Sequence, residues 1–314
     1  MSGRSNACIK VTSPSFSKNR ILTSELYSYF PDSTFNMSGK ELEERDLVEF
    51  LNGAEGAIVS LNNIDEYVLT HCQKLQIISK YGVGLDNIDQ EACCRNNVVI
   101  GWTPGTNKRS VSELTLGYIL GLARNIYQSS HQLKRGEWNK QGGWQLSEKT
   151  VGIIGVGHVG KDLVSLLQPF HCTILVNDIL PQKEYYSAYN LIEVSKDDLF
   201  AQSDIVTLHV PLTNETRHLI NERTLELMQS NTYLINTSRG AVVNQNHLKA
   251  ALLSGRIAGA ALDVYEVEPP IDYEFLEMRN LICTPHIGGS AYEGVMAMGR
   301  SAIGHLRAYF NAGR

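Results

Sequence analysis

The fold of this chain is decided by the stretch VGIIGVGHVG, which runs from Val151 to Gly160. An apolar run leads into three glycines with the spacing G-x-G-x-x-G, and apolar residues at helical spacing follow. This pattern predicts a strand, a tight turn and the start of a helix. Gly155 permits the turn, Gly157 leaves the backbone open to a pyrophosphate, and Gly160 lets the helix pack closely on the strand. The unpaired N–H groups and the dipole at the start of such a helix favour phosphate binding.

The next apolar run supports a dinucleotide site. Residues Thr173 to Val176 predict a second strand, which ends at Asn177 and Asp178. Asp178 follows Gly160 by roughly 20 residues, the separation at which an acidic side chain binds the adenosine ribose in such sites. Closely spaced glycines also occur in turns that bind nothing, but the second strand and its terminal acid favour the dinucleotide.

The composition limits the class of protein. At 314 residues the chain can form two domains, and its 43% hydrophobic and 19% charged content is that of a globular protein. The net charge of −5 argues against a nucleic-acid-binding surface. The six cysteines lack C-x-x-C spacing, which argues against disulfides and against a metal site. The N-terminus is short and polar, and no apolar run is long enough to span a bilayer, so we expect a soluble, cytoplasmic protein with no membrane partner.

Strands and helices alternate along the chain about every twenty residues, which predicts parallel sheets with helices on both faces, an α/β fold. Ser38 to Glu41 match a capping box for a helix that continues through Leu51. The segment from Trp102 to Asn107 contains Pro and Gly and predicts a crossing between domains. Residues 110–126 predict one helix that is buried on several sides. Trp138 and Trp144, in the polar arm after it, need cover, which either a partner subunit or packing within the chain could supply.

Candidate ligand-binding residues follow the predicted strands, because ligands bind beyond the carboxyl ends of the strands in such sheets. In the first third, these positions are the loops at Ser60–Asn63 and Tyr81–Asn87. The small residues of the second loop could offer N–H groups to an anion, or could simply reverse the chain. In the second half, a polar residue ends each predicted strand. These residues are Asp178, His209, Arg239, Asp263 and His286.

Three side chains suit the chemistry of a nicotinamide cofactor, which supplies a hydride but leaves one proton to be managed by the protein. Histidine is the usual proton carrier near neutral pH, and His286 is the candidate. Arg239 can bind a substrate carboxylate through two hydrogen bonds. A carboxylate beside the histidine would favour the charged imidazole, and both Glu266 and Glu268 are candidates for that role.

Motifs of one family occur in order along the chain. They are Tyr81–Asn87, Asn107–Glu113, Val151–Gly160, His209–Thr213, Asn236–Gly240, Asp263–Pro269 and Thr284–Gly289. With this ordered set, the chain resembles the D-isomer-specific 2-hydroxyacid dehydrogenases over nearly its whole length. The resemblance implies two doubly wound parallel-sheet domains. A Rossmann NAD-binding domain, residues 104–287, would be inserted in a flavodoxin-like substrate-binding domain formed by residues 1–103 and 288–314.

The resemblance also implies a role for each candidate residue. Arg239 would bind the substrate carboxylate and polarise the carbonyl, and His286 would be the acid/base, with Glu268, just before Pro269, as its partner in place of Glu266. The residues implied for substrate binding are Ser60, Tyr81, Val83, Gly84, Asn107, Arg239 and His286. The residues implied for NAD binding are Gly155, Gly157, His158, Val159, Gly160, Asp178, His209, Val210, Pro211, Thr216, Thr237, Ser238, Asp263 and Gly288. Asp178 would favour NAD over NADP, and the family usually forms homodimers through the helix from Ser110 and the arm after it.

Within the family, the chain is most similar to the 3-phosphoglycerate dehydrogenases, but one departure bears on the substrate. Those enzymes tend to carry an arginine after the second clear strand of the substrate domain, whereas Val59–Asn63 contains no cation. We therefore expect a small, unphosphorylated D-2-hydroxy or 2-keto acid as the substrate. The alternative is a 3-phosphoglycerate dehydrogenase without a regulatory domain, in which other cations compensate. The candidates are Lys108, Arg109, Lys134 and Arg135.

A function of another class is an NAD-sensing corepressor-like binding protein, because relatives of the family act in this way with the same fold and catalytic residues. Such proteins carry longer terminal tails, which we do not expect here. Glu268 argues against the formate and phosphite dehydrogenase branches, where the family resemblance places a glutamine or other surroundings.

Overall fold

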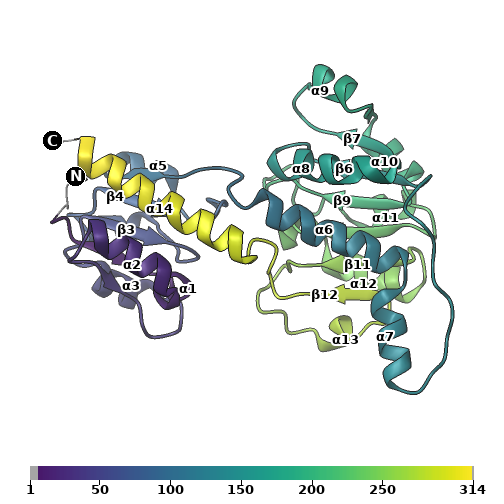
Figure 1. The fold of residues 1–314 in the computed structure, drawn as a ribbon, viewed down its shortest axis with the longest axis horizontal. Coiled ribbons are helices and arrows are strands. Elements are labelled where there is room, and N and C mark those ends of the chain that lie inside the picture. Colours follow the sequence, from purple (N-terminus) through teal and green to yellow (C-terminus); the bar gives the residue numbers. More distant parts are fainter. Residues whose placement is uncertain (1–5, 313–314) are drawn as a thin grey trace. The chain divides into compact units, whose positions relative to one another are not determined.

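The computed structural model describes residues 6–312, which divide into two units (Figure 1). The first unit comprises the described residues up to Asn107 together with those from Tyr292 onward, and the second comprises Lys108–Ala291. The chain thus crosses between the units where the helices α6 (Lys108–Ala123) and α14 (Tyr292–Ala312) begin, a few residues beyond the predicted crossings.

The described part of the first unit contains a five-stranded parallel sheet with the strand order β2-β1-β3-β4-β5. This is the flavodoxin-like order, in which the chain reverses direction across the sheet between β1 and β3. The strands are β1 (Ile9–Val11), β2 (Thr34–Phe35), β3 (Gly56–Val59), β4 (Ile77–Lys80) and β5 (Val99–Gly101). All residues of β3 and β4 are buried, as expected for central strands that are covered on both faces.

Helices cover both faces of this sheet (Figure 1). One face packs against α1 (Pro14–Lys18), α2 (Arg20–Tyr29) and α14, and the other against α3 (Glu44–Leu51), α4 (Glu66–His71) and α5 (Gln90–Arg95). Asp65 and Asp89 cap α4 and α5 by accepting hydrogen bonds from backbone N–H groups of the first turn.

The capping box predicted at Ser38–Glu41 is wrong. Helix α3 begins only at Glu44, and its N-cap residue makes no side-chain cap hydrogen bond. The Ser38 hydroxyl donates instead to Oδ1 of Asn36 at 2.7 Å, and Nδ2 of Asn36 donates to the Lys40 carbonyl at 2.8 Å. These local side-chain bonds stabilise a turn at the position where the helix was expected to start.

The second unit contains a seven-stranded parallel sheet in the order β12-β11-β10-β9-β6-β7-β8 among the described residues. This is the Rossmann order with an added strand, and the reversal of strand order lies between β6 and β9. The strands are β6 (Thr150–Ile154), β7 (Thr173–Asn177), β8 (Ile192–Glu193), β9 (Ile205–Leu208), β10 (Tyr233–Asn236), β11 (Gly259–Leu262) and β12 (Leu281–Cys283). The two sheets confirm the predicted fold class.

Two hydrophobic cores lie on opposite faces of this sheet. On one face the sheet packs against α6 and α8 (His158–Leu167), and on the other against α10 (Lys196–Gln202), α11 (Glu222–Leu227) and α12 (Gln245–Leu253). The remaining helical segments are α7 (Ile126–Lys134), η1 (Gln168–Phe170), α9 (Lys183–Ala188), η2 (Gly240–Val242) and α13 (Tyr273–Leu276).

The helix predicted over residues 110–126 is divided in the structure. Helix α6 ends at Ala123, Asn125 has a left-handed backbone with φ of 51°, and α7 begins at Ile126. The cause is the returning arm, because the Trp144 N–H donates to the Ala123 carbonyl at 2.8 Å and a Cβ at Gly143 would lie 1.9 Å from that oxygen. The arm thus occupies the acceptor that the next turn of α6 would need.

The two tryptophans of the arm differ in how far their side chains are buried. The Trp144 ring packs near Tyr233, with ring centroids 5.9 Å apart, and beneath the Lys149 ammonium, so the chain itself covers much of it. Trp138 remains 77% exposed.

No helix in residues 6–312 combines the length and apolar character that a membrane crossing requires.

Candidate active site

The glycine turn after β6 forms as predicted. Gly155 has a φ of +93°, and a Cβ there would lie 2.6 Å from the His209 carbonyl oxygen. A Cβ at Gly160 would lie 2.2 Å from the Gly155 carbonyl oxygen, so α8 can approach the turn only because this residue is glycine. Around Gly157, by contrast, a Cβ would meet no atom of the described chain within 4 Å. The backbone at Gly157 is therefore open to a ligand, and the turn fits a dinucleotide pyrophosphate. His158 and Val159 begin α8 beside it.

Asp178 follows β7 and stabilises the same turn. Its Oδ2 accepts a hydrogen bond from the Val156 N–H at 2.6 Å, and its Oδ1 accepts one from the Leu180 N–H at 2.8 Å. The carboxylate thus lies directly beside the glycine turn, and its binding to the adenosine ribose remains a prediction. Ile179, the next residue, is 95% exposed.

The glycine turn supports a direct comparison of two substitutions. Gly160→Ala should destabilise the protein by about 1–3 kcal/mol and weaken NADH binding, because its Cβ can be accommodated only by moving α8 away from the turn. Gly157→Ala should leave the melting temperature near that of the parent and weaken NADH binding alone. Thermal unfolding and NADH fluorescence titration measure the two effects. Unchanged NADH affinity in both variants would show that the turn does not hold the cofactor.

The loop after β9 carries four predicted cofactor residues. His209 continues the sheet, since its N–H donates to the Ile154 carbonyl at 2.8 Å. Burial lowers the pKa of its imidazole. Val210 lies against Gly155. The Thr216 hydroxyl donates to the Pro211 carbonyl at 2.6 Å and closes the loop. These bonds keep the loop beside the glycine turn.

The turn after β10 positions Arg239. Oδ1 of Asn236 accepts hydrogen bonds from the N–H and the hydroxyl of Ser238, at 3.0 and 2.8 Å, and Nδ2 donates to the Arg239 carbonyl at 2.9 Å. The Thr237 hydroxyl is bonded to that of Thr115 on α6 at 3.0 Å. A Cβ at Gly240 would lie 1.9 Å from the Tyr265 carbonyl, so the Arg239 turn is in direct backbone contact with the segment after β11.

His286 and Glu268 form a close pair. The His286 Nδ1 lies 2.7 Å from the Glu268 Oε2, and the two side chains are 45% and 37% exposed. The hydrogen bond to Glu268 raises the pKa of His286, outweighing partial burial, and the charges of Glu268 and Asp263 add to this rise while Arg239 opposes it. Burial acts to raise the pKa of Glu268, but the hydrogen bonds from His286 and the Tyr265 N–H, with the charges of His286 and Arg239, lower it overall.

The other acid, Glu266, has different partners. Its Oε1 lies 2.5 Å from Nε2 of His218, and its Oε2 accepts a hydrogen bond from the Gln245 N–H at 3.3 Å. Of the two candidate acids, the structure therefore brings Glu268 to His286.

Asp263 is 1% exposed and holds the loop that carries His286. Its Oδ1 accepts from the Ile287 N–H and its Oδ2 from the Gly288 N–H, both at 2.7 Å, and the Thr284 hydroxyl donates to Oδ1. The carboxylate is thus engaged by the chain's own donors at Thr284, Ile287 and Gly288, and its predicted contact with the cofactor remains a prediction.

The substrate-binding residues predicted in the first unit lie after β3, β4 and β5. Tyr81 is 5% exposed and packs edge-on against Phe16, which is a core position. The N–H groups of Val83 and Gly84 donate to no acceptor in the described chain, so they remain available to an anion. Asn107 is buried, and its Oδ1 has no hydrogen-bond partner within residues 6–312.

Ser60 is held by a lysine that the sequence analysis did not single out. The buried Lys80 donates from Nζ to the Ser60 carbonyl and to Oδ1 of Asn87, both at 2.5 Å. The lysine thus ties the Ser60–Asn63 loop to the Tyr81–Asn87 loop. Asn236 and Thr284 were also missed as positioning residues, although an Asn followed by Ser directly after a strand is a turn signal that could have revealed the first.

Known proteins resemble this chain in sequence and structure. The family described as "D-isomer specific 2-hydroxyacid dehydrogenase, NAD binding domain" matches residues 116–288. The D-3-phosphoglycerate dehydrogenase of Methanocaldococcus jannaschii is 38% identical over 263 residues, which are 82% of this chain and 50% of that protein. The glyoxylate reductase of Thermococcus litoralis is 37% identical over 264 residues, which are 81% of this chain and 80% of that one.

A solved structure agrees with these matches. The crystal structure of a glyoxylate reductase from Paecilomyes thermophila superimposes with a TM-score of 0.86 at 26% identity and covers 98% of this chain and 97% of that one. The chain spans only 50% and 61% of the length of the two phosphoglycerate dehydrogenase relatives that it matches, from Methanocaldococcus jannaschii and Schizosaccharomyces pombe.

The family match covers most of the second unit and identifies it as an NAD-binding domain, which confirms the predicted cofactor. Together with the two parallel sheets and the glycine turn, these findings show that the chain belongs to the D-isomer specific 2-hydroxyacid dehydrogenase family.

Proposed function

We propose that this chain transfers a hydride between NAD(H) and a small D-2-hydroxy acid or 2-keto acid. The observation that carries the proposal is the His286–Glu268 pair, with Nδ1 and Oε2 2.7 Å apart, beyond the carboxyl ends of β12 and β11. The same edge of the sheet carries Arg239 after β10 and the glycine turn after β6. A proton carrier, an anion-binding side chain and a cofactor turn therefore share one edge, where such sheets bind ligands.

In the proposed reduction, each side chain has one task. NADH, held at the glycine turn, would supply a hydride to the carbonyl carbon of the substrate. Protonated His286 donates its proton to the carbonyl oxygen, and Glu268 orients the imidazole and stabilises its charged form. Arg239 binds the substrate carboxylate and stabilises the negative charge that develops on the carbonyl oxygen. Asp178 binds the adenosine ribose and so favours NAD over NADP.

The proposed substrate is unphosphorylated, because Val59–Asn63 contains no cation and the two arginines that could compensate are engaged in ion pairs. Nε of Arg109 lies 3.0 Å from Oδ2 of Asp162, and Nε of Arg135 lies 3.0 Å from Oε1 of Glu137. Lys80 is buried against the Ser60 carbonyl and Asn87. The 37% identity to a glyoxylate reductase, which spans 80% of that protein, supports a small keto acid.

The test is a panel of keto acids at fixed NADH, followed by absorbance. We expect glyoxylate or hydroxypyruvate to give a kcat/KM well above that for 3-phosphohydroxypyruvate, and NADH to be preferred to NADPH. A clear preference for 3-phosphohydroxypyruvate would favour the phosphoglycerate dehydrogenase alternative. Tight NADH binding without turnover of any keto acid would favour the corepressor-like alternative.

We also propose a homodimer in the cytoplasm. Support for the dimer comes from the exposed apolar side chains of α7 and the arm, where Ile126, Leu133 and Trp138 are 58, 57 and 77% exposed. The six free cysteines are consistent with a reducing compartment. Light scattering coupled to size exclusion should give twice the 34.9 kDa mass of the chain, and Leu133→Glu should lower it. A monomer at micromolar concentration would contradict the dimer.

The rate of reduction should depend on pH through His286. Since Glu268 raises the pKa of His286, the protonated donor persists to higher pH than in a free imidazole, and kcat/KM for reduction should fall only above that raised pKa. Oxidation of the hydroxy acid, which needs neutral imidazole, should rise over the same range. In Glu268→Gln the charge that supports the imidazolium is lost, so the alkaline fall should move to lower pH.

The control for the pH profile is Glu274→Gln, which breaks an ion pair with Lys249 elsewhere in the second unit. It should leave the profile unchanged. An alkaline fall at the same pH in the parent and in Glu268→Gln would contradict the role of Glu268.

A further inference from the structure

A second histidine–carboxylate pair lies close to the first. Nε2 of His218 is 2.5 Å from Oε1 of Glu266, and the side chains are 38% and 29% exposed. His218 lies at the end of the loop that carries Pro211 and Thr216, and Glu266 lies two residues before Glu268. The pair therefore joins the predicted cofactor loop to the segment that supports the proton donor.

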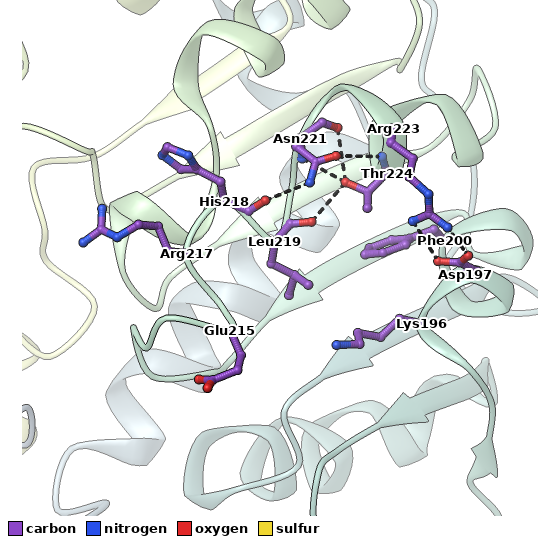
Figure 2. Close-up of a pocket in the computed structure, with 10 residues that line it drawn as sticks. All are labelled: Lys196, Asp197, Phe200, Glu215, Arg217, His218, Leu219, Asn221, Arg223 and Thr224. Atoms are coloured by element: carbon purple, nitrogen blue, oxygen red, sulfur yellow. Dashed lines mark hydrogen bonds and ion pairs between the residues drawn. The ribbon is translucent and has the colours of Figure 1, made fainter.

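The backbone at His218 is fixed independently of its ring. Its φ is 53°, its N–H donates to the Ala241 carbonyl at 2.8 Å, and its carbonyl accepts from Nδ2 of Asn221 at 2.9 Å. Figure 2 shows His218 at the rim of a cavity of about 290 Å³, with the bond from Asn221 to its carbonyl, and with its imidazole directed away from Phe200 and Asp197 on the far side. The ring thus extends from an anchored backbone position to Glu266.

Glu266 is fixed in turn to the Arg239 turn. Its Oε2 accepts from the Gln245 N–H, and Gly240 is in direct contact with the Tyr265 carbonyl and the Glu266 N–H. The Tyr265 N–H donates to Oε1 of Glu268 at 3.0 Å, which leaves Oε2 for His286. A displacement of Glu266 would therefore move both the backbone donor of Glu268 and the carboxylate itself.

We infer that His218 and Glu266 are a positioning pair, which holds the segment Tyr265–Glu268 so that the Glu268 carboxylate meets His286 at hydrogen-bond distance. Neither residue contacts the reacting atoms in this inference, which rests on the proposed function only for its effect on turnover. The charged groups that act on His286 itself are Glu268, Asp263 and Arg239. Loss of the pair should loosen the Glu268–His286 bond and so lower the pKa of His286.

The test compares Glu266→Ala, Glu266→Gln and His218→Asn. Asparagine suits the left-handed backbone at His218, so only the ring is lost. We expect Glu266→Ala and His218→Asn to lower kcat by about tenfold, since misplacement of a catalytic group by 1 Å can cost about 10²-fold, and to leave NADH affinity within about twofold of the parent. Glu266→Gln, whose amide oxygen can still accept from His218, should retain most of the activity.

The direction of the pKa change of His286 separates positioning from simple electrostatics. NMR titration of the His286 ring in the full chain, assigned with His286→Asn, measures this pKa without turnover. Loss of positioning lowers the pKa of His286 in His218→Asn, whereas an effect of charge alone would not lower it, because this variant removes no negative charge. In a Glu268→Gln background, Glu266→Ala should not lower the pKa of His286 further, because the bond between residue 268 and His286 is already altered.

The matched control is Arg223→Gln, which breaks the exposed Arg223–Asp197 ion pair on the same side of the unit (Figure 2). This variant should change neither kcat nor the pKa of His286. Three results would overturn the inference: an unchanged His286 titration in both His218→Asn and Glu266→Ala, a rise of the pKa in His218→Asn, or equal effects of Glu266→Ala and Glu266→Gln. If the parent reduces no keto acid, the proposed function fails, while the NMR titration still decides the positioning role.

Discussion

Replacing His286 with asparagine should lower kcat for keto acid reduction by about 10²–10⁴-fold, the range that a general acid usually contributes. His286 has a φ of 53°, which asparagine adopts readily, so the variant keeps the backbone and removes only the imidazole. Without the ring, the proton donor of the proposed reduction is lost. Initial rates with saturating NADH and the best keto acid measure the loss.

The control for this variant is His171→Asn. His171 is exposed, lies in the same unit and has a φ of 55°, so the substitution makes the same chemical change far from the strand edge that carries His286. It should retain parental turnover. Both variants should bind NADH as the parent does, because His286 is not among the predicted cofactor residues. Near-parental turnover in His286→Asn would exclude His286 as the proton donor.

Replacing Arg239 with glutamine should lower kcat/KM for the keto acid by about 10²–10³-fold, the effect of removing one donor that stabilises a developing oxyanion. Arg239→Lys should fall between the glutamine variant and the parent, since lysine keeps the charge but cannot form two parallel hydrogen bonds with a carboxylate. NADH affinity should change little in either variant. Steady-state kinetics with varied keto acid, and fluorescence titration with NADH, separate the two effects.

The control is Arg279→Gln, at an exposed arginine of the same unit. It should leave kcat/KM unchanged. Equal loss in Arg239→Lys and Arg239→Gln would show that the geometry of the guanidinium matters more than its charge, and no loss in either variant would remove Arg239 from the substrate site. Because Arg239 lowers the pKa of His286, the glutamine variant should also extend the reduction rate to higher pH.

The elements that could be predicted from sequence are those with a strong local signal. The glycine turn requires residues without side chains at Gly155 and Gly160, and this demand is visible in the sequence alone. The buried strands β3 and β11 are continuous apolar runs, which can be recognised without knowing their neighbours.

Elements that depend on distant partners could not be predicted. The break between α6 and α7 arises because the arm at Gly143 and Trp144 takes the Ala123 carbonyl, and no residue near Ala123 reveals this. The choice between Glu266 and Glu268 likewise depends on His218 and His286, one on each side along the chain. Local chemistry made both glutamates equivalent, so the sequence favoured Glu268 only through the family resemblance, and the folded chain brings Glu268 to His286.

The contact of Gly240 with Tyr265 has a consequence for changing the substrate of this protein. The turn that carries Arg239 and the segment that carries Glu268 meet through one main-chain contact, which offers no side chain that a substitution could adjust. A library that varies this region should therefore yield mostly inactive proteins. The loops predicted to bind substrate, Ser60–Asn63 and Tyr81–Asn87, belong to the first unit, so substitutions there leave the spacing of Arg239, Glu268 and His286 untouched.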